Sequence, residues 1–345
     1  MKQLSLISIA LLLLAACARV PLPGEDGAPI RFCAQGGGMQ VHTRVSENPH
    51  EKDYLIADGN SVAVYGTWSA TEEGEGQEVF GRTIVTCSEV EPSRFLWSYE
   101  NPKYWRKNGI YDFRGVYPTS VHCQYGTSGR RIVTTYSMHT DDVDLMVASR
   151  RVPITTGVAM TDSVKLQFRH ATTAIRFLFQ KGENVETMYR LNSFELQNLH
   201  TVGVLMFQGE DLTTDSWHPA EFVTQKILAW TAATPADRID VPERYADYTA
   251  ERWHYVIPQT LVSRNNTDAA VRFSVTVNDS PTPIYTTLPL PQTYRDSQNV
   301  EHDVVWEPGK KYNYYIQIQP SQASIIVKAV PWDSFFVAVD DLVFE

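Results

Sequence analysis

The acidic stretch His139-Thr140-Asp141-Asp142-Val143-Asp144 holds the side chains best suited to chemistry, because carboxylates and an imidazole together can bind a divalent cation. It lacks the glycine and the distal glutamate that an EF-hand loop requires. We therefore interpret it as a solvated turn that leads into a strand near Leu145. His170 lies in an alternating stretch and is predicted to be packed or paired, with no catalytic role.

Other motifs of enzyme chemistry are missing from the sequence. There is no Gly-x-Ser-x-Gly, no P-loop and no HExxH, and no CxxC or Cys/His spacing for zinc. His218 and His254 each follow a tryptophan, without an acid spaced for a proton relay. The sequence thus predicts no catalytic residue, no metal site and no cofactor, and the protein is not expected to be an enzyme.

Several tryptophans could form a platform on which sugar rings stack. They are Trp97, Trp105, Trp217, Trp230 and Trp253. Large aromatic side chains are more often part of a hydrophobic core, so we favour that interpretation.

The first residues predict export and lipidation. Lys2 precedes an apolar run from Leu4 to Leu14, and Leu14-Ala15-Ala16-Cys17 resembles the bacterial lipobox. Residues 1–16 would be a lipoprotein signal peptide, Cys17 the acylated N-terminus, and 17–29 a tether. Several acyl chains would anchor the protein stably in the outer membrane, at the cell surface. The alternative is an ordinary signal peptide with an incidental cysteine.

Removal of the signal peptide and lipidation of Cys17 leave Cys33, Cys87 and Cys123. Because three is an odd number, at least one thiol stays unpaired or pairs with another chain. A bond between Cys87 and Cys123 is possible, but the sequence does not assign the pairing.

Composition favours an all-β fold. The 345 residues are 43% hydrophobic, rich in Tyr, Trp, Val and Thr, and carry a net charge of −10. This acidity speaks against a nucleic-acid partner. Many short alternating stretches separated by turns indicate β-sandwiches.

The chain end is expected to close a sheet with a β-hairpin. After the turn Pro308-Gly309, the side chains of Tyr312, Tyr314, Ile316 and Ile318 alternate with polar ones, which indicates a half-buried strand. A second strand follows from Ile325. Only 220–230 and 242–248 could hold a helical turn or two.

Several of these stretches together resemble the fimbrillin family, the Mfa-like pilins and lipoproteins of type V fimbriae. They are Trp97-Ser98-Tyr99 with Tyr104-Trp105, Tyr111 to Pro118, Asp144 to Ala148, Val164 to His170, Ile257-Pro258-Gln259, and Trp306 to Tyr314. The resemblance implies two tandem transthyretin-like β-sandwich domains. They would occupy residues 30–152 and 158–345, the second with a terminal strand appendage.

The resemblance also implies a mode of assembly by strand exchange. Polymerising members are cut after an arginine, and the first strand is lost; here the candidate site is Arg44. The candidate displaced strand carries Ile30, Phe32 and Ala34. A terminal strand of the next subunit fills the groove, and the candidate donor here carries Phe335, Val337 and Val339. This donor could equally be the last strand of its own sandwich.

The function expected from the resemblance is a structural subunit of a cell-surface fimbrium with a role in adhesion. Its partners would be other fimbrial subunits, joined head-to-tail, and the outer membrane through the lipid. The sequence leaves open whether the chain is stalk, tip or anchor, and which host or bacterial surface it adheres to. The alternative is a monomeric outer-surface lipoprotein that binds a glycan or a host protein.

Overall fold

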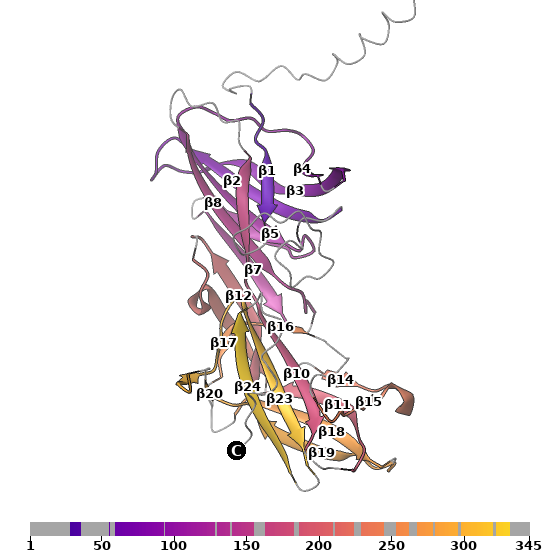
Figure 1. Ribbon diagram of the computed structural model, residues 1–345. Helices are drawn as coiled ribbons and strands as arrows, with labels where there is room; N and C mark the ends of the chain where they lie inside the picture. Colours follow the sequence, from indigo (N-terminus) through magenta and orange to yellow (C-terminus); the bar gives the residue numbers. More distant parts are fainter. Residues whose placement is uncertain are drawn as a thin grey trace, which may run out of the picture.

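The computed structural model of the protein describes residues 28–35, 55, 59–92, 94–127, 130–138, 140–154, 163–182, 186–209, 211–223, 229–244, 253–261, 268–278, 280–295, 298–319 and 322–331. These residues form β-strands and two short 3-10 helices, η1 (Thr214–Ser216) and η2 (Pro235–Asp237). The predicted all-β class is confirmed. The strands build an elongated body with the early strands at one end and the late strands at the other (Figure 1).

A seven-stranded sheet forms the N-terminal end. Its order is β1 (Phe32–Gln35), β9 (Val164–His170), β8 (Met146–Ile154), β5 (Gly109–Tyr117), β2 (Ser61–Ser69), β3 (Gln77–Glu91) and β4 (Arg94–Ser98). The edge strands β1 and β4 contact each other, so the sheet curls around its own core. The N-terminal core comprises the buried side chains inside this curl, among them Phe80, Phe113 and Phe168. Gly115 makes room for one of them, because a β-carbon there would lie 2.5 Å from Cζ of Phe168.

Further sheets build the middle and the C-terminal end. One has the order β13 (Trp217–Val223), β12 (Leu199–Phe207), β7 (Arg131–Ser137) and β6 (Gln124–Gly126). Another has the order β16 (His254–Val256), β10 (Thr173–Lys181), β23 (Lys310–Ile318) and β24 (Ala323–Pro331). A third has the order β14 (Ala229–Thr231), β11 (Tyr189–Gln197), β18 (Ala270–Val277) and β19 (Ile284–Pro289), and β15 (Ile239–Asp240) also pairs with β11. Two small ribbons are β17 (Gln259–Thr260) with β22 (Val305–Trp306) and β20 (Thr293–Arg295) with β21 (Glu301–Asp303).

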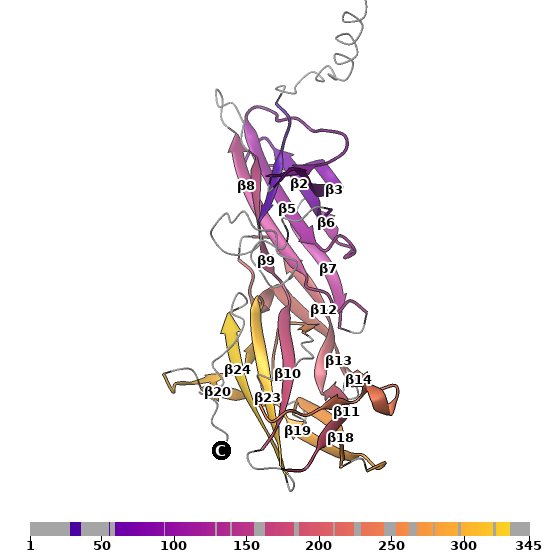
Figure 2. The same ribbon diagram turned by 45° about the vertical axis from the view of Figure 1, so that its right-hand side comes forward.

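The chain passes directly from the N-terminal sheet into the C-terminal half of the body. β9 lies in the N-terminal sheet, and after Ala171 and Thr172 the chain continues as β10 in the C-terminal half (Figure 2). A second, larger core is continuous across this junction, because Tyr65 and Val147 of the N-terminal sheet belong to the same cluster as Tyr314. The division into domains 30–152 and 158–345 stays a prediction.

The predicted hairpin near the chain end is confirmed as β23 and β24, which pair antiparallel from Lys310↔Pro331 to Ile318↔Ala323. Gly309 adopts the positive φ of 69° that its turn requires. The prediction of a half-buried strand is wrong, since Asn313 is 0% and Gln317 is 9% exposed. Both faces of β23 are covered, because successive side chains such as Tyr312 and Asn313 are buried alike, while its two edges pair with β10 and β24.

The expected helical turn at 220–230 is also wrong within the described residues. The chain is extended up to Val223 in β13 and again in β14. Pairing with other strands overrides the local tendency to form a helical turn, because β13 pairs with β12 and β14 pairs with β11.

Candidate functional site

Strand β1 and the residues before it form the site that the sequence singled out for strand exchange. Ile30, Phe32 and Ala34 alternate with Arg31 and Cys33, so period-two geometry puts them on one face. In the structure these three side chains are 1%, 4% and 1% exposed and belong to the N-terminal core. Arg31 on the opposite face is exposed.

Backbone pairing holds this segment from two sides. β1 runs parallel to β9, from Phe32↔Val164 to Gln35↔Gln167. Just before β1, the Ile30 amide donates to the Lys103 carbonyl at 2.8 Å. The segment therefore fills a gap between the edge of β9 and the loop that follows β4.

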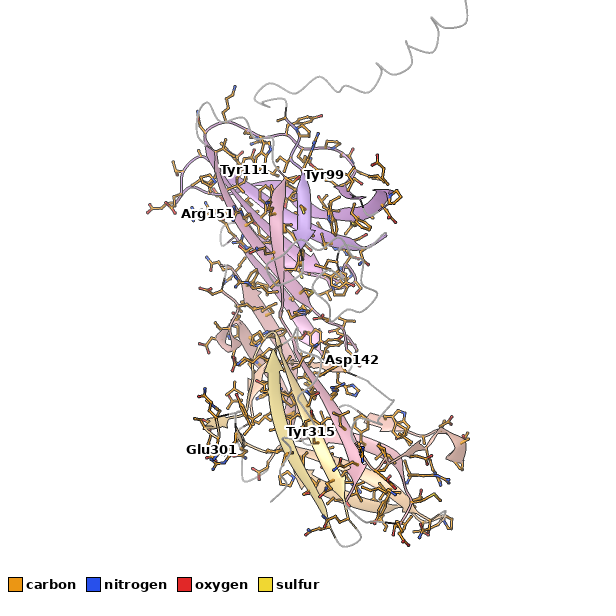
Figure 3. All side chains as sticks on the ribbon, viewed as in Figure 1. Tyr99, Tyr111, Asp142, Arg151, Glu301 and Tyr315 are labelled. Atoms are coloured by element: carbon orange, nitrogen blue, oxygen red, sulfur yellow. The ribbon has the colours of Figure 1, made fainter. Side chains whose placement is uncertain are left out.

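The ring of Phe32 packs in this gap against three other aromatic rings. Its centroid lies 5.2 Å from that of Phe80, 5.4 Å from that of Phe113 and 5.8 Å from that of Tyr99. The Tyr99 hydroxyl donates to the Ile30 carbonyl at 2.7 Å, and burial raises the pKa of this hydroxyl. Tyr99 and Tyr111 lie at the N-terminal end of the body (Figure 3). No sequence pattern linked these aromatic residues to β1, because they come from β3, β5 and a loop.

This geometry defines what removal of the strand would do. The vacated gap would be lined by Phe80, Phe113 and Tyr99, and the edge of β9 would lose its partner. An apolar slot beside an unpaired strand edge is a template for a foreign strand with alternating apolar side chains.

The other predicted site residues lie outside the described residues. These are Cys17, Arg44, and the donor residues Phe335, Val337 and Val339. Their roles stay predictions. Among the residues that the structure describes, none belongs to a helix with the length and hydropathy that a membrane span needs.

The acidic stretch around residue 141 does not gather its carboxylates at one point. Asp141 accepts from the Ser137 amide at 2.6 Å, and Asp142, near the middle of the body, accepts from the Tyr255 amide at 3.1 Å (Figure 3). Asp144 faces Nδ1 of His170 at 2.9 Å, which confirms that this histidine is paired. No metal-binding group of three or more side chains occurs within the described part of the chain. The prediction of a solvated turn needs correction, because Asp144 is 7% exposed.

The tryptophans do not form an exposed platform. Trp97, Trp105 and Trp217 are 8%, 2% and 3% exposed and fill the two cores. Trp230 packs partly buried against Phe194. Trp253 lies over the guanidinium of a buried arginine, Arg176. The core interpretation therefore holds for the first three.

The described cysteines form no disulfide bond with one another. Cys33, Cys87 and Cys123 are all present as thiols. Burial raises the pKa of Cys123 to about 11, so this thiol is a poor nucleophile at neutral pH. The pairing of Cys87 with Cys123 that the sequence allowed is not formed.

The fold and the buried edge strand define a class: an all-β protein whose first strand completes a sheet from its edge. Residues 43–332 match the family described as fimbrillin-like, and the chain belongs to this family. This membership confirms the resemblance and the prediction that the protein is not an enzyme. No curated protein matches the sequence significantly.

Solved structures share the fold at low sequence identity. A fimbrial protein from Bacteroides vulgatus is 13% identical with a TM-score of 0.51, over 81% of this chain and 95% of that one. A candidate cell adhesion protein from Bacteroides ovatus is 16% identical with a TM-score of 0.50, over 88% of this chain and 98% of that one. At these identities the likeness establishes the fold alone.

Proposed function

We propose that this chain is a structural subunit of a cell-surface fimbrium, acts in adhesion, and assembles with other subunits by exchanging β1 for a strand of its neighbour. The observation that carries the proposal is the position of β1. It is an edge strand with a short parallel pairing, yet its side chains complete a hydrophobic core. Membership of the fimbrillin-like family supports the same role.

Energetics favour refilling of the gap once β1 is removed. Burial of a large apolar side chain contributes roughly 1.5–3 kcal/mol, so Ile30 and Phe32 together account for several kcal/mol. That is a large share of a typical folding free energy of about 5–15 kcal/mol. A subunit without β1 would therefore gain strongly from a replacement strand.

The proposed donor has the matching pattern. Phe335, Val337 and Val339 repeat the i, i+2, i+4 spacing of Ile30, Phe32 and Ala34. β1 lies in the N-terminal half, whereas β24, the last described strand, lies in the C-terminal half (Figure 1). Acceptor and donor on different parts of one subunit give a head-to-tail contact that does not close, which builds a filament.

Processing would control this exchange. Acylated Cys17 would carry the precursor to the outer membrane, and cleavage after Arg44 would release β1 together with the lipid. An uncut chain would keep its own strand and remain a membrane-bound anchor or cap.

Mass spectrometry of material sheared from cells that express the full-length chain tests the proposal. We expect an N-terminus at Val45 and detergent-resistant ladders. Arg44→Ala should leave β1 attached and stop polymerisation, and removal of Phe335 to Glu345 should give a folded monomer. Arg244→Ala, at an arginine that is exposed in the described part of the chain, is the matched control and should assemble normally.

Ladders that persist in both test variants would remove strand exchange from the function of this chain. A monomer that starts at acylated Cys17 would instead support the alternative of a binding lipoprotein.

A further inference from the structure

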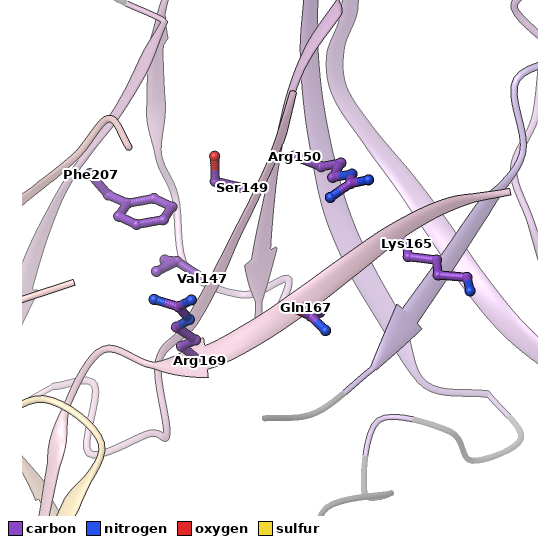
Figure 4. Close-up of a pocket in the computed structure, with 7 residues that line it drawn as sticks. All are labelled: Val147, Ser149, Arg150, Lys165, Gln167, Arg169 and Phe207. Carbon is purple, nitrogen blue, oxygen red and sulfur yellow. The ribbon is translucent and has the colours of Figure 1, made fainter. Parts of the chain in front are cut away.

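A hollow of about 160 Å³ opens in the N-terminal sheet where β8 and β9 separate. It lies between β8 and β9, beside the end of β12 (Figure 4). The residues that line it are Val147, Ser149, Arg150, Lys165, Gln167, Arg169 and Phe207.

The fork between two strands creates this hollow. β8 and β9 pair at Met146↔His170, Val147↔Arg169 and Ala148↔Phe168. Among the described residues, no pairing between them continues beyond Ala148, although β8 runs on to Ile154 and β9 begins at Val164. The side chain of Arg150 can therefore reach a hollow whose other wall is β9.

The charges around the hollow are all of one sign. Arg150, Lys165 and Arg169 line it, and no Asp or Glu does. All three side chains are exposed, and neither Arg150 nor Lys165 forms an ion pair within the described residues. Arg150 and Lys165 thus bring two positive charges to the hollow that no described carboxylate neutralises, and an anion bound there would interact favourably with both. A cluster of three cationic side chains is unusual in this protein, because the net charge of the chain is −10.

The other residues that line the hollow indicate which class of ligand would supply the negative charge. Gln167 and Ser149 offer hydrogen bonds, while Val147 and Phe207 form an apolar floor, with exposed fractions of 1% and 2%. Polar donors above an apolar floor suit a sugar ring, which has hydroxyl groups and a C–H face. The volume corresponds to roughly five water molecules, which is room for one anionic group and part of a ring. A nucleic acid is disfavoured by the acidic net charge.

We propose that the hollow between β8 and β9 binds the carboxylate or sulfate group of an acidic glycan. Charge-assisted hydrogen bonds from Arg150, Lys165 and Arg169 hold the anionic group, and Gln167 and Ser149 contact neighbouring hydroxyls. This goes beyond the structural role of the chain, because it gives the subunit a ligand of its own. The site is present in the single chain and does not depend on strand exchange.

Isothermal titration of the purified full-length chain tests this site. The probes are heparin oligosaccharides, which carry sulfate, oligogalacturonate, which carries carboxylate alone, and uncharged cello-oligosaccharides. We expect binding of one or both anionic probes, weakening as ionic strength rises, and no binding of the neutral probe. An anionic probe that binds alone identifies the group, and binding of both shows that the hollow accepts sulfate as well as carboxylate.

Substitutions tie the binding to the hollow. Arg150→Gln, Lys165→Gln and Arg169→Gln should each weaken binding about tenfold or more, and the triple variant should abolish it. Arg244→Gln removes the same charge from an exposed position near the far end of β10 and should bind like the wild type. Circular dichroism controls for the fold of each variant.

Three results would overturn the proposal: neither anionic probe binds, the triple variant binds as tightly as the wild type, or single-stranded DNA binds as well as the glycans. Because all are read on the monomer, failure here leaves the assembly experiments unaffected.

Discussion

Truncation of Phe32 should destabilise the uncut chain far more than truncation of its neighbour Cys33. The Phe32 side chain is 4% exposed and lies among three aromatic rings at 5.2–5.8 Å. Phe→Ala in a core costs about 3–5 kcal/mol. An edge position lets water or neighbouring rings relax into the gap, so we expect about 3 kcal/mol.

The assay is equilibrium urea denaturation followed by the fluorescence of the buried tryptophans Trp97 and Trp105 in the same core. For a unit of 150–250 residues, about 3 kcal/mol also lowers the melting temperature by roughly 6–12 °C. Cys33→Ala, on the opposite face of the same strand, is the matched control and should change stability by less than about 1 kcal/mol.

If Phe32→Ala and Cys33→Ala destabilised the chain equally, the reasoning would be refuted. The face of β1 that carries Phe32 would then contribute no more to stability than the face that carries Cys33. A second readout separates folding from processing. Limited trypsin digestion should release β1 from Phe32→Ala faster than from the wild type, because the strand is held more weakly.

Three further perturbations follow from buried contacts. Asp112→Asn removes the carboxylate that pairs with Arg130 at 3.0 Å and should cost about 3 kcal/mol in urea denaturation, because it leaves a largely buried cation unpaired. Gly109→Ala should destabilise by about 3 kcal/mol in thermal unfolding, because its β-carbon would lie 2.2 Å from an indole nitrogen and 2.6 Å from a backbone oxygen. Burial raises the pKa of the Cys123 thiol from 9.0 to about 11, so the folded state holds this proton more tightly. The stability it contributes, up to about 2–3 kcal/mol, is present below pH 9 and lost as the pH rises to 11, which urea denaturation at pH 8 and pH 11 measures.

Each of these has a control. Glu72→Gln breaks the exposed pair with Arg151 and should cost under about 1 kcal/mol. Gly126→Ala meets no atom within 4 Å and should change stability by no more than about 0.5 kcal/mol. Cys123→Ala should lose less stability than the wild type between pH 8 and pH 11. Test variants that behave like their controls, or a Cys123→Ala profile equal to that of the wild type, would contradict the burial argument.

Local patterns in the sequence predicted the strands well where burial follows alternation. Tyr312, Tyr314 and Ile316 share a core face as expected, and so do Ile30, Phe32 and Ala34. The pattern was misleading for Asn313, whose polar side chain suggested solvent although it is fully buried. Only part of the lining of the cationic hollow could be predicted from the sequence. Lys165, Gln167 and Arg169 alternate on one face, but no sequence pattern placed Arg150 beside them.

By itself, then, the sequence determined the all-β class, the hairpin at the end and the apolar face of the first strand. These depend on period-two alternation and on turn residues, which act over a few positions. Only the tertiary structure decided that β1 runs parallel to β9, that β10 runs parallel to β23, and that β8 and β9 separate beyond Ala148. A strand edge offers the same N–H and C=O groups to any partner, so its neighbour is selected by packing between residues far apart in the chain.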